Sequence, residues 1–183
     1  MNRVLTLPNM LSSLRMCLIP LVFYWILNSN STNHPWLLAV FAFALGLDFL
    51  DGYLARRFSQ ESELGKILDP LADKLLTLFS IAALTIVSDF PLWVTIPVVT
   101  RDLIILLASS VMYRQKHLVK GSIALGKITF FLISLLIFVY IIDLNPAFNL
   151  GVIKRFFALT SLAFVVWSFD EYFLVYQRVK KNG

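Results

Sequence analysis

The sequence has 183 residues, a formal net charge of +5, 58% hydrophobic residues and a mean hydropathy of +0.78. This balance excludes a soluble globular protein, because a core of that size would leave no polar residues to cover it. The length indicates one domain, residues 1–183. Cys17 is the single cysteine and excludes an intramolecular disulfide. Basic residues flank the apolar runs, so the positive charge indicates anionic lipid and phosphate partners and no nucleic acid.

The apolar runs predict an all-α membrane protein with six transmembrane helices, each near the ~20 residues that a bilayer needs. A short N-terminal segment, residues 1–12, is too polar to span and is expected at the membrane interface. The expected spans, in chain order, are 11–27, 36–57, 69–87, 91–113, 128–142 and 156–176. In the third span, Asp69 suits the N-cap and Pro70 the first helical position. No cleavable signal peptide is expected.

The placement of Lys and Arg predicts the orientation of these spans. Most of the basic residues lie on one side, only Lys154 and Arg155 lie on the other, and Arg101 lies within the fourth span. We therefore expect an integral protein of the cytoplasmic membrane or of an organelle inner membrane. Both termini and the loop between the second and third spans are expected on the cytoplasmic or matrix side.

Four aspartates, here called the motif aspartates, lie at the polar edges of the second and third apolar runs: Asp48, Asp51, Asp69 and Asp73. An α-helix turns about 100° per residue, so the first two lie roughly 60° apart on one helix surface. The other two, spaced i and i+4, share a face of the next helix. Two helices joined by a short turn can therefore direct all four carboxylates into one cleft.

Four carboxylates in a partly desolvated cleft need a compensating positive charge, because like charges and burial both disfavour ionisation. The ligands are all oxygen, with no His or Cys in the stretch, which favours Mg²⁺ or Mn²⁺ over Zn²⁺. Arg56 and Arg57 add the positive charge that a phosphate requires. The alternative is a pair of solvated helix ends whose acids pair with neighbouring Arg and Lys residues, and four aspartates at this spacing argue against it.

The pattern D-x2-D-G-x2-A-R-x8-G-x3-D-x3-D resembles the signature of the CDP-alcohol phosphotransferases, and the apolar layout resembles that family along the whole chain. The positions that carry it are Asp48, Asp51, Gly52, Ala55, Arg56, Gly65, Asp69 and Asp73. The resemblance implies a membrane enzyme that moves a phosphatidyl group from CDP-diacylglycerol to an alcohol and releases CMP. It also implies a homodimer.

The resemblance further implies a role for each position. The motif aspartates would bind a pair of Mg²⁺ or Mn²⁺ ions, and Asp73 would also be the general base. The positions expected to receive the cytidine and its phosphates are Gly52, Ala55, Arg56 and Gly65.

The segment PNMLSSLR resembles a P-N-x-L-[ST]-x-x-R element of the phosphatidylglycerophosphate and cardiolipin synthase branch. The resemblance implies that Asn9, Ser12 and Arg15 contact the nucleotide or its phosphates. The residues alone allow another interpretation, a helix cap and an Arg at the membrane interface. Both interpretations stay open at this point.

Arg101 and Asp102 lie midway along the fourth expected span, where an isolated charge is costly. In a functional interpretation Arg101 clamps a phosphate on the acceptor, assisted by Lys127, Arg114 and Lys120. In a structural interpretation Arg101 pairs with Asp102 or with another helix. The same branch has an Arg followed by an acid in this span and a Lys that opens the fifth.

An Arg and Lys pocket favours an acceptor that carries phosphate. Glycerol 3-phosphate is the simplest, giving phosphatidylglycerophosphate, whereas phosphatidylglycerol would make the protein a cardiolipin synthase. The segment LGKITF lacks the K-x-K-T form of many bacterial phosphatidylglycerophosphate synthases, so the choice stays open. The non-enzyme alternative is a small cation-binding transporter. The second and third spans are almost wholly apolar beyond Asp48 and Asp73, which argues against a polar path through the membrane.

Overall fold

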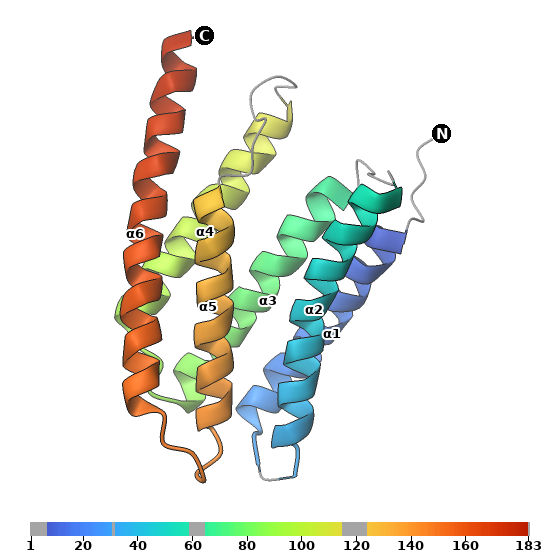
Figure 1. Cartoon of the computed structure of the whole chain (residues 1–183), viewed down its shortest axis with the longest axis vertical. Coiled ribbons are helices and arrows are strands. Elements are labelled where there is room, and N and C mark those ends of the chain that lie inside the picture. Colours follow the sequence, from blue (N-terminus) through green and yellow to red (C-terminus); the bar gives the residue numbers. More distant parts are fainter. Residues whose placement is uncertain (1–6, 31, 59–64, 115–123, 183) are drawn as a thin grey trace. The chain divides into compact units, whose positions relative to one another are not determined.

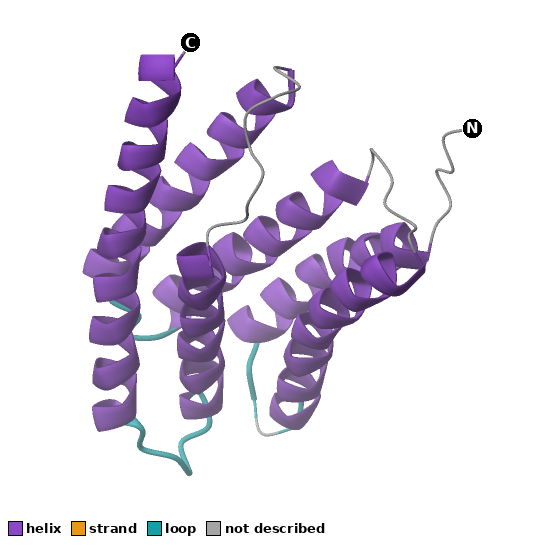
Figure 2. Ribbon diagram, turned by 45° about the horizontal axis from the view of Figure 1, so that its top comes forward, coloured by secondary structure: helices purple, strands orange, loops and turns teal. Residues whose placement is uncertain are grey.

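The computed structural model describes residues 7–30, 32–58, 65–114 and 124–182 (Figure 1). Within these ranges six helices follow one another: α1 Leu7–Leu27, α2 His34–Phe58, α3 Gly65–Val87, α4 Leu92–Arg114, α5 Ala124–Asp143 and α6 Gly151–Asn182. The described residues contain no strand (Figure 2). The all-α prediction is therefore confirmed.

Each helix overlaps its expected span, but several boundaries differ: α1, α3 and α5 each begin four residues earlier than expected, and α6 extends beyond its expected span at both ends. Helix α3 begins at Gly65, so Asp69 and Pro70 lie inside its first turns and not at its N-cap and first position. Gly65, Ala72 and Leu76 are buried and fall on one face of α3 at helical spacing. Packing of this face outweighs the one backbone hydrogen bond that Pro70 cannot donate.

Three helices in the described part of the chain are long and apolar enough to cross a membrane. They contain the stretches Asn9–Leu27, Leu125–Asp143 and Gly151–Asp170, and the apolar part of α2, His34–Asp48, is shorter. Large apolar side chains are also exposed, among them Trp36, Ile86 and Val152. Such exposure is costly in water and favourable in lipid. Six membrane spans stay a prediction. Residues 7–12 of the expected interfacial segment belong to α1, and residues 1–6 lie outside the described part.

The helices form two compact units. The first unit comprises Met1–Phe90 and Ile137–Leu150, and the second comprises Pro91–Leu136 and Gly151–Gly183. Helix α5 thus begins in the second unit and ends in the first. The expectation of a single domain stays a prediction.

Helix α1 is central to the first unit because it packs against both α2 and α3. Its buried face repeats every three or four residues, as a helix packed along its length requires. The buried residues on this face are Asn9, Ser12, Arg15, Ile19, Val22 and Ile26. The face is polar near the start of α1 and apolar towards its end, so one helix supplies both a polar site and a hydrophobic core.

The end of α5 closes the apolar side of the first unit. The Phe138 ring stacks on Phe41 of α2 with centroids 6.3 Å apart, and Tyr140 contacts Phe90 at 4.6 Å. His34, the buried first residue of α2, donates a hydrogen bond from Nε2 to the Ile141 carbonyl over 2.8 Å. A carbonyl only accepts, so this contact determines which ring nitrogen carries the proton.

We expect His34→Ala to lower the melting temperature of the purified protein by roughly 3–8 °C. The substitution leaves the buried Ile141 carbonyl without its imidazole donor, and a buried hydrogen bond lost in this way costs about 1–3 kcal/mol. Thermal unfolding in detergent measures the change. Thr32→Ala, an exposed position in the preceding turn, is the matched control. Equal melting temperatures for the two variants would contradict the prediction.

Candidate active site

The motif aspartates lie at one end of the first unit. Asp48 and Asp51 occupy the last three turns of α2, and Asp69 and Asp73 occupy the first three turns of α3. Figure 1 shows these two helix ends beside the start of α1. The predicted placement of aspartates from two consecutive helices at a common end is therefore found.

Arg15 of α1 connects the two helices that carry these aspartates. Its Nη1 atom lies 3.4 Å from Oδ1 of Asp48 on α2, and the same nitrogen forms an ion pair with Oδ1 of Asp73 on α3. The Arg15 side chain is fully buried, whereas those of Asp48 and Asp73 are 26% and 20% exposed. A buried guanidinium is tolerated only with charged partners, so these contacts determine where α1 docks.

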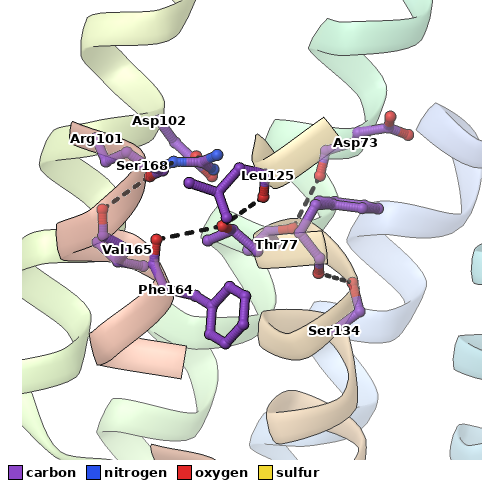
Figure 3. Close-up of polar contacts among 11 residues, drawn as sticks. Asp73, Thr77, Arg101, Asp102, Leu125, Ser134, Phe164, Val165 and Ser168 are labelled. Atoms are coloured by element: carbon purple, nitrogen blue, oxygen red, sulfur yellow. Dashed lines mark hydrogen bonds and ion pairs between the residues drawn. The ribbon is translucent and has the colours of Figure 1, made fainter. Parts of the chain in front are cut away.

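Ser12 lies one helical turn before Arg15 and contacts a third motif aspartate. Its hydroxyl donates a hydrogen bond to Oδ1 of Asp69. Further along α3, the Thr77 hydroxyl donates to the backbone carbonyl of Asp73 over 3.0 Å, within its own helix (Figure 3). Ser12 and Arg15 of α1 together contact Asp48, Asp69 and Asp73.

These contacts bear on the open interpretations of the N-terminal element. Arg15 is a buried residue in contact with Asp48 and Asp73, and its position relative to the membrane interface stays a prediction. Asn9 is buried on the same face, at 4% exposure. Contact of Asn9, Ser12 and Arg15 with a nucleotide stays a prediction.

Several predicted site residues lie partly outside what the structure describes. The backbone of α2 includes Asp51, Gly52, Ala55 and Arg56, but their side chains are outside the described part. Gly65 is described and is buried at the start of α3. The predicted roles of these residues stay predictions.

The chemistry of the described donors fits a hard divalent cation. Asp48, Asp69 and Asp73 offer carboxylate oxygens, the ligands that Mg²⁺ and Mn²⁺ prefer. Among the described side chains, no three acidic, His or Cys groups yet converge closely enough to hold a metal ion. Asp48 and Asp73 converge on Arg15 instead. This statement does not cover the fourth motif aspartate, Asp51, because its side chain lies outside the described part.

In the second unit, Arg101 is buried near the middle of α4, where α4 packs against α6. Its Nη1 donates to Oδ1 of Asp102 over 2.8 Å, and its Nε donates to the hydroxyl of Ser168 on α6 over 3.1 Å. Ser168 in turn donates to the Val165 carbonyl over 2.8 Å (Figure 3). The structural pairing considered from the sequence is therefore present, and the acceptor role of Arg101 stays a prediction.

The structure describes only some of the residues that are expected to assist Arg101. Lys127 is exposed in the first turns of α5. Two residues further on, the buried Thr129 donates its hydroxyl to the Leu125 carbonyl over 2.8 Å and lies 3.4 Å from the Phe164 carbonyl of α6. Arg114 ends α4, with its side chain outside the described part, and Lys120 lies wholly outside it.

Apolar helices of spanning length, together with the cluster of acidic and basic side chains in the first unit, indicate a helical membrane-associated protein. The chain belongs to the CDP-alcohol phosphatidyltransferase family, which it matches over residues 5–167. Members of this family generally use divalent metal ions. The family resemblance seen in the sequence and the expectation of a membrane-associated protein are thereby confirmed.

Three relatives are informative. The chain is 34% identical over 173 residues to the CDP-diacylglycerol--glycerol-3-phosphate 3-phosphatidyltransferase of Aquifex aeolicus, covering 93% of this chain and 95% of that protein. It is 38% identical over 120 residues to the cardiolipin synthase (CMP-forming) of Streptomyces coelicolor, covering 63% and 55%. A Pseudomonas fluorescens protein with the same name as the Aquifex one is 35% identical over 105 residues, covering 55% and 53%. The chain thus spans about half the length of the last two relatives.

Sequence reasoning missed the contacts of Ser12 and Arg15 with the motif aspartates. A signal for them was present, because both residues share a helical face with the apolar Ile19, Val22 and Ile26. Polar residues that continue an apolar helical face are expected to be buried and to need partners. The position of those partners, on α2 and α3, could not be read from the periodicity.

We expect Ser12→Ala to weaken Mn²⁺ binding about tenfold, the lower end of the usual loss when a residue that orients a metal ligand is removed. The physical reason is that Asp69, an expected ligand, loses the hydroxyl that holds its carboxylate. Electron paramagnetic resonance of Mn²⁺ with the purified protein measures the affinity. The matched control is Ser13→Ala, the exposed serine next to it. Equal affinities in the two variants would show that Ser12 does not orient a ligand.

Proposed function

We propose that this protein transfers a phosphatidyl group from CDP-diacylglycerol to glycerol 3-phosphate, giving phosphatidylglycerophosphate and CMP. The observation that carries the proposal is the similarity to the Aquifex aeolicus transferase of that name along nearly the whole of both chains. The motif aspartates support it, because the family pattern is complete in this sequence.

In the proposed reaction the acceptor hydroxyl gives its proton to the Asp73 carboxylate as its oxygen attacks the phosphorus that carries the diacylglycerol. The new phosphorus–oxygen bond forms as the bond to the bridging diphosphate oxygen breaks, and CMP leaves with that electron pair. The Arg15 guanidinium forms an ion pair with the Asp73 carboxylate and holds it in place. When bound, the divalent cation supplies neutralisation of the diphosphate and of the leaving group.

The remaining predicted residues have binding roles in this proposal. Asp48, Asp51 and Asp69 bind Mg²⁺ or Mn²⁺ together with Asp73. Gly52, Ala55, Arg56 and Gly65 receive the cytidine and its phosphates, with Asn9 and Arg15 at their edge. The acceptor phosphate is bound by Arg101, Lys127, Arg114 and Lys120.

The Arg101 contacts refine its proposed role. Asp102 and Ser168 hold the guanidinium through Nη1 and Nε, so it is oriented before any acceptor binds. An oriented guanidinium loses less side-chain entropy when it contacts a phosphate than a mobile lysine does. This arrangement supports an acceptor that carries phosphate.

The second candidate is a cardiolipin synthase that uses phosphatidylglycerol. The similarity to the Streptomyces coelicolor cardiolipin synthase favours it locally, with higher identity over a shorter stretch. We rank it second because that similarity covers only 63% of this chain. The homodimer, and a site facing the cytoplasm or matrix, complete the proposal.

An acceptor panel tests the proposed reaction. Purified protein is supplied with CDP-diacylglycerol, Mn²⁺ and either glycerol 3-phosphate, phosphatidylglycerol, serine or inositol. CMP release is measured, and the lipid product is identified by mass spectrometry. We expect phosphatidylglycerophosphate as the main product.

Two controls accompany the panel: protein without an acceptor, and protein in excess chelator with metal removal verified. We expect little CMP from either, because an all-carboxylate site needs a cation to hold a diphosphate. Cardiolipin as the main product would favour the second candidate. Cation transport without CMP release would favour the transporter alternative.

We expect Asp73→Asn to lower turnover by roughly 10²-fold or more, the usual contribution of a general base. The amide keeps the shape of the side chain and one oxygen but accepts a proton poorly. CDP-diacylglycerol should still bind to the variant in the presence of metal. Turnover and lipid affinity are measured on the same preparation.

Asp89→Asn is the matched control, since Asp89 is an exposed acid in the turn after α3. We expect near-normal turnover from it. Near-normal turnover in Asp73→Asn, or a loss confined to lipid binding, would remove Asp73 from the role of base.

A further inference from the structure

Arg15 is placed on the buried side of two motif aspartates. The guanidinium is fully buried, whereas Asp48 and Asp73 each keep an exposed portion. One nitrogen, Nη1, contacts Oδ1 of both carboxylates. A cation that arrives from solvent would therefore meet these carboxylates from the side opposite Arg15.

We propose that Arg15 is a built-in counter-cation that neutralises Asp48 and Asp73 from their buried side, so that the first unit stays folded when no divalent cation is bound. This inference rests on the proposed function, because it takes these two aspartates as metal ligands. With Arg15 in place, the protein can fold before it binds its metal.

The electrostatic argument begins with the helices that carry the charges. Asp48 belongs to α2 and Asp73 to α3, and α1 packs against both. Two carboxylates in a partly desolvated site repel one another and resist ionisation. A single guanidinium in contact with both converts this repulsion into attraction that holds α2 and α3 against α1.

Ser12 provides an internal comparison within the same face of α1. It donates a neutral hydrogen bond to Asp69, whereas Arg15 supplies a full positive charge to the other two aspartates. Ser12 can orient its carboxylate but cannot neutralise it. The two residues should therefore respond differently to metal when they are replaced.

Replacement of Arg15 by a neutral residue removes the positive charge that contacts both aspartates, and a bound divalent cation can supply positive charge in its place. A ligand that binds the folded state stabilises it in proportion to the logarithm of its concentration over its dissociation constant. Without Arg15 nearby, the cation also meets less repulsion. The variant should thus be unstable in chelator and bind metal more tightly than the wild type.

The test compares melting temperatures of the full-length purified protein in chelator and in saturating Mn²⁺, together with Mn²⁺ affinity. In chelator, we expect the melting temperature of Arg15→Gln to be about 5–10 °C below that of wild type. In saturating Mn²⁺, the difference between the two melting temperatures should be less than half as large. The Mn²⁺ affinity of Arg15→Gln should be about tenfold higher. Arg15→Lys keeps the charge, so its melting temperature should change between chelator and Mn²⁺ by about as much as that of wild type.

Arg101→Gln is the matched control, because Arg101 is also buried and paired with an aspartate, but outside the motif. We expect this variant to lose the same melting temperature in chelator and in Mn²⁺. An Arg15→Gln variant that behaves in this way, or that binds Mn²⁺ more weakly than wild type, overturns the proposal. Wild-type protein that binds no Mn²⁺ would instead remove the metal site from the proposed function.

A double variant, Arg15→Gln with Asp73→Asn, keeps the test decisive if the single variant does not fold. It removes one negative charge together with the positive one. We expect it to fold and to melt in chelator closer to wild type than Arg15→Gln does. A double variant that is no more stable than the single one overturns the proposal.

Discussion

The contact of one buried guanidinium with carboxylates from two helices is the constraint on which the first unit depends. Burial of the Arg15 charge requires charged partners, and Asp48 and Asp73 are two of them. The same contact joins α1 to α2 and α3 and holds Asp48 and Asp73 at a common end of the unit. Packing of α1 and the placement of these two aspartates are therefore linked through one electrostatic contact.

Helix α1 meets this requirement by dividing its buried face into two parts. Near its start the face carries Ser12 and Arg15, and towards its end it carries Val22 and Ile26. The apolar part contributes to a hydrophobic core that the end of α5 also joins through Phe138. That core provides rigid support for the polar part, as the precise placement of a functional site requires.

In the second unit, the buried charge of Arg101 has a partner close to it in the sequence. Arg101 is paired with the next residue in the chain, Asp102, and is held from α6 by Ser168. A charge inside an apolar helix is costly, so such partners are needed whatever the function is. The arrangement also leaves the guanidinium oriented, which is the property that a phosphate-binding residue needs.

The sequence by itself determined the helices, the aspartate motif and the family, because these depend on local periodicity and on residue spacing. It placed the start of α3 wrongly, since burial of Gly65 on the face of Ala72 and Leu76 outweighs the local preferences of Asp69 and Pro70. The partners of Ser12 and Arg15 were decided only by the tertiary structure. They lie on helices far along the chain, and burial of a charge is satisfied by whatever packing brings near it.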